Sequence, residues 1–397
     1  MVSGAPSSLT LLGATGSIGS SAVAVIRANP GRFRVEAVAG GRNAGGLAKL
    51  ARDLGATCAA ISDESAYRDL KNELFGSGIA PLGGASGVCE AAARPSDRVV
   101  AAITGVAGLQ ATCVALERGA TVALANKEAM VSAGKAVLAV ARKGRATILP
   151  LDSEHNALFQ ALGGAPIEAV ARMTLTASGG PFRTWTAERI AAATLEQALA
   201  HPNFAMGSKI TVDSASMMNK GLELIEAHFL FGLPESRLDV VVHPQQLIHG
   251  LVTFADGSVN AGMAMPDMRV PMAHCLTYPE RCDSGARGLD LLTIGRLDFE
   301  APDDVRFPAL RLAREALKAG KSAPTVLNAA NEVAVEAFLA RKIRFCDIAA
   351  TVETVMNLPG LADQREPETV EEAISVDHVS RFHAAQALSL RARRVTN

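Results

Sequence analysis

Hydrophobic and polar positions follow different patterns in successive parts of the chain. Residues 1–150 contain short, nearly continuous hydrophobic runs separated by Ala-rich stretches of helical periodicity. Runs of this kind, alternating with helices, are typical of a parallel sheet that helices cover on both faces. The expected strands lie at 8–13, 32–40, 56–62, 98–104, 121–126 and 146–151. We therefore expect an α/β fold that begins with a Rossmann-like domain over 1–150.

The pattern changes after residue 150. In LVTFADGSVNAGMAM (251–265), hydrophobic and polar positions alternate on both sides of an Asp-Gly pair, which predicts a β-hairpin. Further strand-like segments at 168–178 and 238–244 indicate a central α+β domain over 151–285. Residues 286–307 are expected to form a connecting segment. From Pro308 the spacing is helical and predicts a C-terminal bundle of about four helices over 308–397.

Composition and charge exclude several classes of function. The 397 residues are 49% hydrophobic and 20% charged, and 39 Lys+Arg balance 40 Asp+Glu to give a net charge of −1. Without a basic stripe, nucleic acid is not the expected partner. No hydrophobic run reaches the length of a membrane span, and the first residues lack a cationic targeting region, so we expect a cytoplasmic protein. The six cysteines form no C-x-x-C pair and are expected to be reduced, buried thiols.

A glycine loop follows the first expected strand. In GATGSIGSS, the residues Gly13, Gly16 and Gly19 have G-x-x-G-x-x-G spacing between a strand and a helix. That context allows the backbone to approach a phosphate that the helix N-terminus binds. The alternative is an ordinary tight turn between a strand and a helix.

The end of the second strand indicates which dinucleotide would bind. NAD-binding sites usually have an acidic residue there, which holds the ribose 2′-hydroxyl, whereas this chain has Gly41, Arg42 and Asn43. An arginine suits a 2′-phosphate, so NADP is favoured over NAD. The alternative is an arginine that is simply exposed on the surface.

The segment LPLDSEHN (149–156) ends a hydrophobic strand with Asp152 and Glu154. Two residues apart on an extended chain, these side chains would project from the same face. Adjacent carboxylates repel unless a cation lies between them or one is protonated, and oxygen ligands without thiolates suit Mg²⁺ or Mn²⁺. The alternative is a polar strand end in which Asp152 or Ser153 caps the next helix. This segment alone leaves both interpretations open.

A third carboxylate lies in the helix expected within 211–232. Its polar residues have i, i+3 and i+4 spacings and share one face: Asn219, Lys220, Glu223 and Glu226. Together with Ser214, this face can hold a phosphate through neutral donors and one ammonium group. The alternative is an exposed helix face with ordinary ion pairs, and the spacing does not choose between Glu223 and Glu226 as the metal ligand.

Two loops add candidate substrate contacts. TASGGPFRTW (176–185) is a polar glycine turn after a strand, in which Ser178 could donate to a phosphate. The loop at 201–210 contains His201, Phe204 and a methionine, and it resembles a lid that closes over substrate and excludes water. The other seven histidines are expected to be structural.

Seven segments, in a fixed order along the chain, form a specific signature: GATGSIGSS, GGRNA, ALANKEAMVSAG, LPLDSEHNALFQ, TASGGPFR, HPNFAMGSKITVDSASMMNKGLELIEA and LNAANEVAVEAFL. In these segments the chain resembles the 1-deoxy-D-xylulose 5-phosphate reductoisomerase family of the non-mevalonate isoprenoid pathway. The resemblance covers essentially the whole chain. It implies NADPH as cofactor, a divalent metal (Mg²⁺, Mn²⁺ or Co²⁺), a small sugar phosphate as substrate and a homodimer.

The resemblance also implies roles for individual residues. NADPH would contact Thr15, Gly16, Ser17, Ile18, Gly41, Arg42, Asn43, Asn126, Glu128 and Gly207. The metal would bind Asp152, Glu154 and Glu223, which selects Glu223 over Glu226. Lys127 and Ser153 would contact the sugar, and Ser178, Ser214, Asn219 and Lys220 would bind the phosphate, with His201 closing over it. Catalytic roles would fall to Lys127, Asp152, Glu154, Glu223 and His201.

The implied reaction rearranges 1-deoxy-D-xylulose 5-phosphate by a retro-aldol and an aldol step. NADPH then reduces the branched aldehyde to 2-C-methyl-D-erythritol 4-phosphate. Two departures from the family pattern are Ala14 in the glycine loop and Phe204, where the lid usually has tryptophan. Two other hypotheses are an NADP-dependent dehydrogenase without rearrangement, which needs no metal site, and a non-catalytic NADP-binding sensor.

Overall fold

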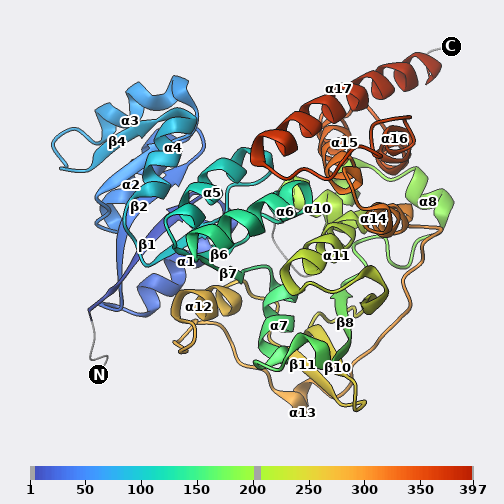
Figure 1. The fold of residues 1–397 in the computed structure, drawn as a ribbon, viewed down its shortest axis with the longest axis horizontal. Coiled ribbons are helices and arrows are strands. Elements are labelled where there is room, and N and C mark those ends of the chain that lie inside the picture. The colour runs from blue at the N-terminus through green and yellow to red at the C-terminus, as the bar shows by residue number, and fades with distance from the viewer. Residues whose placement is uncertain (1–4, 201–206, 396–397) are drawn as a thin grey trace. The chain divides into compact units, whose positions relative to one another are not determined.

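The computed structural model describes residues 5–200 and 207–395, which group into two compact units (Figure 1). The first unit comprises Met1–Ala129, Val137–Asn156 and Asp267–Arg287. The second comprises Met130–Ala136, Ala157–Pro266 and Gly288–Asn397. Each unit has its own sheet, so each is described separately.

The first unit is built on a seven-stranded sheet in which every neighbouring pair is parallel. The strands are β1 (Ser7–Leu12), β2 (Phe33–Gly40), β3 (Cys58–Ile61), β4 (Ala80–Gly83), β5 (Arg98–Ala101), β6 (Thr121–Leu124) and β7 (Thr147–Pro150). Their order in the sheet is β4-β3-β2-β1-β5-β6-β7. The order in which successive strands are added therefore reverses between β1 and β5, and in such sheets ligands bind at the carboxyl ends of the strands flanking that point.

Six of these strands coincide with the hydrophobic runs of the sequence, because strands covered on both faces need hydrophobic residues throughout. The strand that the pattern missed is β4, whose sequence APLG contains Pro and Gly, two residues depleted in strands. It is tolerated because β4 lies at the edge of the sheet. Helices of this unit are α1 (Ser17–Ala28), α2 (Ala44–Asp53), α3 (Tyr67–Glu73), α4 (Gly84–Ala93), α5 (Leu109–Glu117) and α12 (Arg269–Thr277).

Two further helices are divided between the units. They are α6 (Lys127–Gly144), which has a kink at Ala133, and α7 (Ser153–Leu162).

The second unit contains a four-stranded mixed sheet of order β11-β10-β8-β9. Its strands are β8 (Val170–Ala177), β9 (Leu238–Val242), β10 (Ile248–Phe254) and β11 (Val259–Met263). The predicted hairpin is β10–β11, and Gly257 adopts φ +86° in its turn, a conformation that glycine tolerates best. The pair β8–β9 is parallel, while β10 is antiparallel to both of its neighbours.

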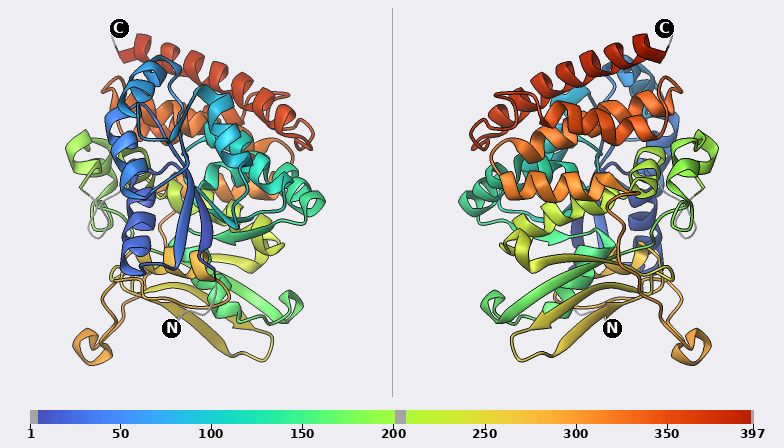
Figure 2. Two further views of the ribbon diagram at one scale, coloured as in Figure 1. Left: turned by 90° about the vertical axis from the view of Figure 1, so that its left-hand side faces the viewer. Right: turned by 90° about the vertical axis from the view of Figure 1, so that its right-hand side faces the viewer.

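Helices complete the second unit, and the last four form the expected C-terminal helical region (orange to red in Figure 2). They are α8 (Ala187–Ala191), α9 (Leu195–Ala198), α10 (Ser208–Ala215), α11 (Met218–Phe231), α13 (Leu291–Ile294), α14 (Pro308–Ala319), α15 (Ala323–Leu339), α16 (Cys346–Met356) and α17 (Val370–Val395). Helices α11 and α14 pack so closely that a Cβ on Gly221 would lie 2.5 Å from the Cβ of Ala313. Glycine at this position therefore lets α11 sit deep in the unit.

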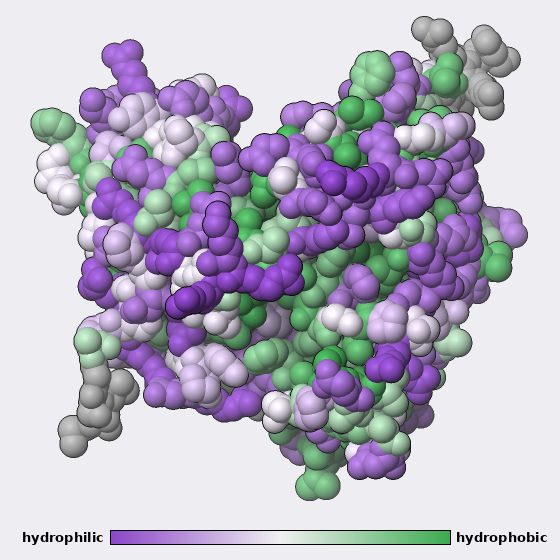
Figure 3. Space-filling model, viewed as in Figure 1, coloured by the Kyte–Doolittle hydropathy of each residue, from purple (hydrophilic) through white to green (hydrophobic). Residues whose placement is uncertain are grey.

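None of the helices in the described part of the chain combines the length and the hydrophobicity that crossing a bilayer requires. The face drawn in Figure 3 is largely hydrophilic, with hydrophobic residues interspersed along α17. Exposed hydrophobic side chains on this helix include Val379, Phe382 and Leu390. All six cysteines are free thiols, and Cys58, Cys113 and Cys275 are buried, whereas the other three are partly exposed.

Candidate active site

The glycine loop connects the carboxyl end of β1 to α1, beside the reversal point of the sheet. Gly13 has φ +88°, and a Cβ there would lie 2.4 Å from the carbonyl oxygen of Ala102, which follows β5. A Cβ on Gly19 would lie 2.2 Å from the carbonyl oxygen of Ala14. The N-cap of α1 is Gly16, which offers no side chain to the N–H groups of the first turn. Those groups are thus suited to an anion, and the predicted contacts Thr15, Ser17 and Ile18 lie around them.

The loop after β2 presents the predicted determinant of the 2′-phosphate. The side chain of Arg42 is 84% exposed, and its Nε lies 3.3 Å from Oδ2 of Asp63. Hydrogen bonds from Ser65, and then the charge of Arg42, hold the pKa of Asp63 below its usual value. Asn43 caps α2, since its Oδ1 accepts from the backbone N of Gly46 at 2.9 Å. An exposed guanidinium that pairs with a surface carboxylate can turn to a phosphate.

A cavity of about 410 Å³ lies between α1 and α2 in the first unit. Thr15 and Asn43, two of the predicted cofactor contacts, are among its lining residues. Lys49 and Arg27 also line it, and Arg27 is 3.5 Å from Asp53. The cavity therefore adjoins the predicted cofactor loop and carries positive charge.

The ANKE segment starts α6 after β6. The Oδ1 of Asn126 accepts from the backbone N of Ala129 at 3.2 Å, and its Nδ2 donates to the carbonyl of Gly105 at 2.9 Å. This N-cap fixes Lys127 and Glu128 in the first helical turn, where both are buried. Nζ of Lys127 lies 2.7 Å from Oδ2 of Asp152. The ammonium group therefore reaches the acidic end of β7.

The geometry at the end of β7 differs from the expected extended one. The strand ends at Pro150 and Ser153 begins α7, so Asp152 and Glu154 do not lie on one face of an extended strand. Oδ1 of Asp152 instead accepts from the backbone N of Glu154 at 3.1 Å, which is helix capping. Capping and metal binding are compatible here, because a carboxylate has further lone pairs. The extended-strand argument was wrong, since a capping aspartate favours helix at the next residue.

One hydroxyl group and one imidazole group form hydrogen bonds with the carboxylates at the same acidic end. Oγ of Ser153 donates to Oε2 of Glu154 at 2.5 Å. Nδ1 of His155, a fully buried ring, lies 3.1 Å from Oδ1 of Asp152. The sequence interpretation gave His155 only a structural role; its i, i+3 spacing from Asp152 in a helix was the signal that could have found this contact.

Asn156 anchors the segment to α12 in the first unit. Its Nδ2 lies 2.8 Å from the carbonyl of Pro150, 3.0 Å from Nδ1 of His274 and 3.5 Å from Sγ of Cys275. Burial lowers the pKa of His274 to about 4, with a further contribution from Arg281. His274 is thus neutral at neutral pH, and this long-range network had no signal in the local sequence.

In the second unit, the polar face of α11 is buried rather than exposed. Lys220, Glu223 and Glu226 are at most 4% exposed. Nδ2 of Asn219 donates to Oε1 of Glu223 at 2.5 Å, and Nζ of Lys220 pairs with Oε2 of the same carboxylate. The interpretation as an ordinary exposed face was wrong, because charges are buried at this density only when they are paired or bind a ligand.

The turn after β8 packs against the end of α10. Oγ of Ser178 accepts from the backbone N of Gly180 at 3.0 Å. Gly180 has φ +66°, and a Cβ there would lie 2.8 Å from the carbonyl oxygen of Ser214. Glycine therefore allows this close approach, which brings the turn that carries Ser178 against the end of α10 that carries Ser214. Asn219 and Lys220 follow in the first turn of α11.

The predicted lid falls largely outside the described residues. His201 and Phe204 lie in 201–206, which the structure does not describe. Gly207 is described: it is exposed and is the N-cap of α10.

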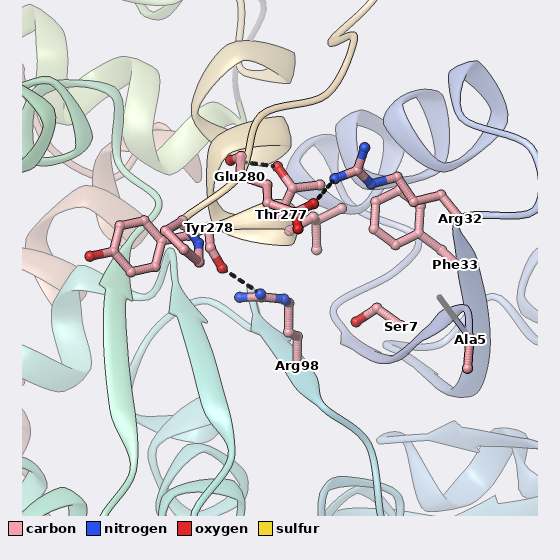
Figure 4. Close-up of a pocket in the computed structure, with 10 residues that line it drawn as sticks. Ala5, Ser7, Arg32, Phe33, Arg98, Thr277, Tyr278 and Glu280 are labelled. Atoms are coloured by element: carbon pink, nitrogen blue, oxygen red, sulfur yellow. Dashed lines mark hydrogen bonds and ion pairs between the residues drawn. The ribbon is translucent and has the colours of Figure 1, made fainter. Parts of the chain in front are cut away.

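A different cavity, of about 360 Å³, lies at the amino ends of β1, β2 and β5 (Figure 4). Arg32 pairs with Glu280 at 2.7 Å, and Arg98 donates to the carbonyls of Cys275 and Tyr278. The cavity contains none of the predicted site residues. Its two arginines already hold the end of α12 against the sheet, so it shows no unexplained charge.

Comparison with family models gives three matches along the chain. A model described as 1-deoxy-D-xylulose 5-phosphate reductoisomerase matches residues 9–134. A model of the C-terminal domain of that enzyme matches residues 148–231, and one described as DXP reductoisomerase C-terminal domain matches residues 263–383.

Curated relatives and solved structures agree with these matches. A 1-deoxy-D-xylulose 5-phosphate reductoisomerase of Afipia carboxidovorans is 56% identical over 381 residues, covering 96% of this chain and 94% of the relative. One of Bradyrhizobium sp. is 53% identical over 382 residues, with the same coverages. The reductoisomerase of Zymomonas mobilis in complex with NADPH has a TM-score of 0.90 at 46% identity, covering 96% of this chain and 99% of that one. A reductoisomerase in complex with NADPH, fosmidomycin and magnesium has a TM-score of 0.93 at 42% identity, covering 97% and 98%.

Proposed function

This chain belongs to the 1-deoxy-D-xylulose 5-phosphate reductoisomerase family, and from that premise we propose which of its residues carry out the reaction. The enzyme converts 1-deoxy-D-xylulose 5-phosphate to 2-C-methyl-D-erythritol 4-phosphate, with NADPH as the hydride donor and a divalent metal. A dehydrogenase without rearrangement, and a sensor without turnover, are not favoured.

NADPH binds at the carboxyl ends of β1 and β2. The proposed contacts are Thr15, Gly16, Ser17, Ile18, Gly41, Arg42, Asn43, Asn126, Glu128 and Gly207. The fit rests on Gly13 and Gly19, which have no room for a Cβ, and on the first turn of α1, which lacks a capping side chain. Arg42 supplies the charge that distinguishes a 2′-phosphate from a 2′-hydroxyl.

Asp152, Glu154 and Glu223 would hold the metal. Their donor atoms are all carboxylate oxygens, as Mg²⁺ and Mn²⁺ prefer. Glu154 and Glu223 are buried, and buried carboxylates are stable only beside cations or hydrogen-bond donors. In the first unit Lys127 lies 2.7 Å from Asp152, and in the second Lys220 pairs with Glu223, so each of these two carboxylates has a cation beside it.

The substrate phosphate is held by Ser178, Ser214, Asn219 and Lys220, with His201 closing over it. The packing of Gly180 against Ser214 supports this grouping for the two serines. Binding energy from the phosphate, which does not react, positions the carbon atoms that do.

The protein positions charge where the reaction develops it. When bound, the metal supplies Lewis-acid stabilisation of negative charge on the substrate oxygens. Ser153 contacts a substrate hydroxyl, and Lys127 presents its ammonium group to the sugar from the first turn of α6. Asn126 holds that turn in place, because its side chain caps the helix and donates to the carbonyl of Gly105.

The observation that supports this assignment most is the gathering of Asp152, Glu154 and Lys127 at the end of β7. The experiment is to follow NADPH oxidation with 1-deoxy-D-xylulose 5-phosphate, in the presence of Mg²⁺ or Mn²⁺ and again with EDTA. Turnover that needs both the sugar phosphate and the metal is expected. Turnover that survives removal of the metal would contradict the three-carboxylate assignment.

Assembly, location and domain roles are further parts of the proposal. A homodimer in the cytoplasm is proposed from the family resemblance. Residues 1–150 would bind the cofactor, 151–285 would bind metal and substrate with a lid near 201–210, 286–307 would connect, and 308–397 would form the helical domain.

A further inference from the structure

The segment LNAANEVAVEAFL belongs to α15, a helix to which the proposed function assigns no role. Two of its polar residues, Asn328 and Asn331, are fully buried. Buried amides are costly unless they form hydrogen bonds. Their partners therefore show what α15 holds in place.

Asn331 contacts α10. Its Nδ2 donates to Oδ1 of Asp213 at 2.8 Å, and the other oxygen of that carboxylate is 2.9 Å from Nζ of Lys209. Asp213 is 1% exposed, so its charge depends on these two neighbours. The next residue along the chain is Ser214, one of the proposed phosphate contacts.

The corner between α10 and α11 transmits the position of Asp213 to the other phosphate contacts. The backbone carbonyl of Asp213 accepts from Oγ of Ser216 at 3.2 Å, and the same Oγ accepts from the backbone N of Met218 at 3.3 Å. Met217 has φ +63°, which is a strained conformation for methionine. Such a conformation persists only where the surroundings fix it. Asn219 and Lys220 follow immediately, so a shift of α10 would displace contacts on both helices.

A second group of contacts shows that α15 also supports α6 within the same unit. Oγ1 of Thr325 donates to the carbonyl of Ser132 at 2.8 Å, and Nδ2 of Asn328 donates to Oγ of Ser132 at 3.1 Å. These bonds lie beside the kink at Ala133. One buried polar face of α15 thus supports α10 and α6, two helices that contain parts of the seven signature segments.

We propose that Asn331 is a positioning residue for the substrate phosphate: by binding Asp213, it fixes the end of α10 and thereby Ser214 and the α10–α11 corner. The proposal rests on the proposed role of Ser214, Asn219 and Lys220. A purely structural Asn331 would instead affect stability and every kinetic constant together.

The first test is Asn331→Leu, which keeps the side-chain volume but removes the donor. The KM for 1-deoxy-D-xylulose 5-phosphate should rise about tenfold, and the Ki of inorganic phosphate as a competitive inhibitor should rise in parallel. The KM for NADPH should stay within about twofold of the wild-type value. Thr351→Val is the matched control: its buried Oγ1 donates to the carbonyl of Asp347 within α16, so the variant loses a buried hydrogen bond without touching α10. Equal effects of the two variants on the KM for the sugar phosphate would overturn the proposal.

The second test is an exchange of the two groups, which remains decisive if Asn331→Leu does not fold. Asp213→Asn and Asn331→Asp should each raise the KM for the sugar phosphate, while the double variant again pairs one amide with one carboxylate. The double variant should recover part of the loss in KM, because the amide–carboxylate pair between α15 and α10 returns while the ion pair of Lys209 with residue 213 does not. A double variant no better than the worse single variant would refute the positioning role.

Ser214→Ala separates failure of this inference from failure of the proposed function. If Ser214→Ala leaves the KM for the sugar phosphate unchanged, the phosphate assignment itself is wrong, and the inference fails with it. If Ser214→Ala raises that KM and Asn331→Leu does not, the phosphate assignment stands and only the role of Asn331 is refuted.

Discussion

The two units use different groups for binding charged ligands. At the carboxyl ends of β1 and β2, the first unit relies on backbone: Gly13 and Gly19 leave no room for a side chain, and the first turn of α1 is capped only by Gly16. In α11, the second unit relies on side chains, where Glu223 and its neighbours Asn219 and Lys220 are mutually hydrogen-bonded.

The two kinds of site are therefore sensitive to different substitutions. A backbone site tolerates changes in side-chain identity, as at Ala14, but it does not tolerate added volume at its glycines. A buried ionic network tolerates small changes of volume better than it tolerates loss of one charge, because the remaining charge is left unpaired. Substitutions in the side-chain site and in the backbone site test this difference.

The largest effect is expected for Glu223→Gln. Removing one of three proposed metal ligands should lower kcat/KM by roughly three orders of magnitude, because stabilisation of the developing negative charge is lost. NADPH affinity, measured by fluorescence titration, should be unchanged. Glu226→Gln is the matched control on the same helix and is equally buried. A larger loss in the control than in Glu223→Gln would reverse the choice of ligand.

The next effect tests the backbone site. Gly13→Ala places a Cβ 2.4 Å from the carbonyl oxygen of Ala102 at φ +88°, so the loop must move and NADPH affinity should fall by roughly a hundredfold. Gly31→Ala is the control, since its φ is +77° but no atom lies within 4 Å of the added Cβ. It should cost about 1 kcal/mol of stability and leave NADPH binding intact. Similar losses of NADPH affinity in both variants would show that strain, not close approach, matters.

A smaller effect concerns cofactor choice. Arg42→Gln should raise the KM for NADPH about tenfold and leave the KM for NADH nearly unchanged, because only the contact with the 2′-phosphate is lost. Arg52→Gln, whose arginine donates to the carbonyl of Glu73, is the control on the adjacent helix. If Arg42→Gln raises both KM values equally, the residue does not select the phosphate.

The smallest effect is on stability in acid. Burial lowers the pKa of His274 from 6.5 to about 4, so the unfolded chain binds a proton that the folded chain refuses. Its contribution is fully present above pH 6.5 and is lost as the pH falls towards 4. The free energy of unfolding should therefore drop by about 1 kcal/mol between pH 7 and 5.5 from this group. Urea titrations of the wild type and of His274→Gln at both pH values would measure this change. The assignment would be contradicted if the free energy of unfolding fell by the same amount in both proteins.

The sequence predicted the parts of the fold that local rules determine. The glycine loop, the strand after it and the hairpin around Gly257 each follow from a few adjacent residues. Asp152 shows the limit of such rules. Its two-residue spacing from Glu154 suggested an extended strand, whereas its capping of α7 makes the segment helical.

Long-range packing accounts for what the sequence could not provide. Periodicity identified the polar face of α11 correctly but could not show that it is buried, because burial depends on which distant segments of the chain pack around the helix. Similarly, Asn331 and Asp213 are far apart in the chain, and nothing near either residue predicts their hydrogen bond. The expectations for His201 remain predictions.

The thiol of Cys275 has a practical consequence. It is fully buried, its Sγ donates to the carbonyl of Pro150 at 3.3 Å, and burial raises its pKa to about 12. A protonated, shielded thiol does not react with alkylating reagents until the structure around it opens. The rate at which Cys275 is labelled therefore measures how often α12 separates from the end of β7, the strand that precedes the acidic residues. Comparing the labelling rates with and without metal or cofactor would show how much each ligand suppresses this opening.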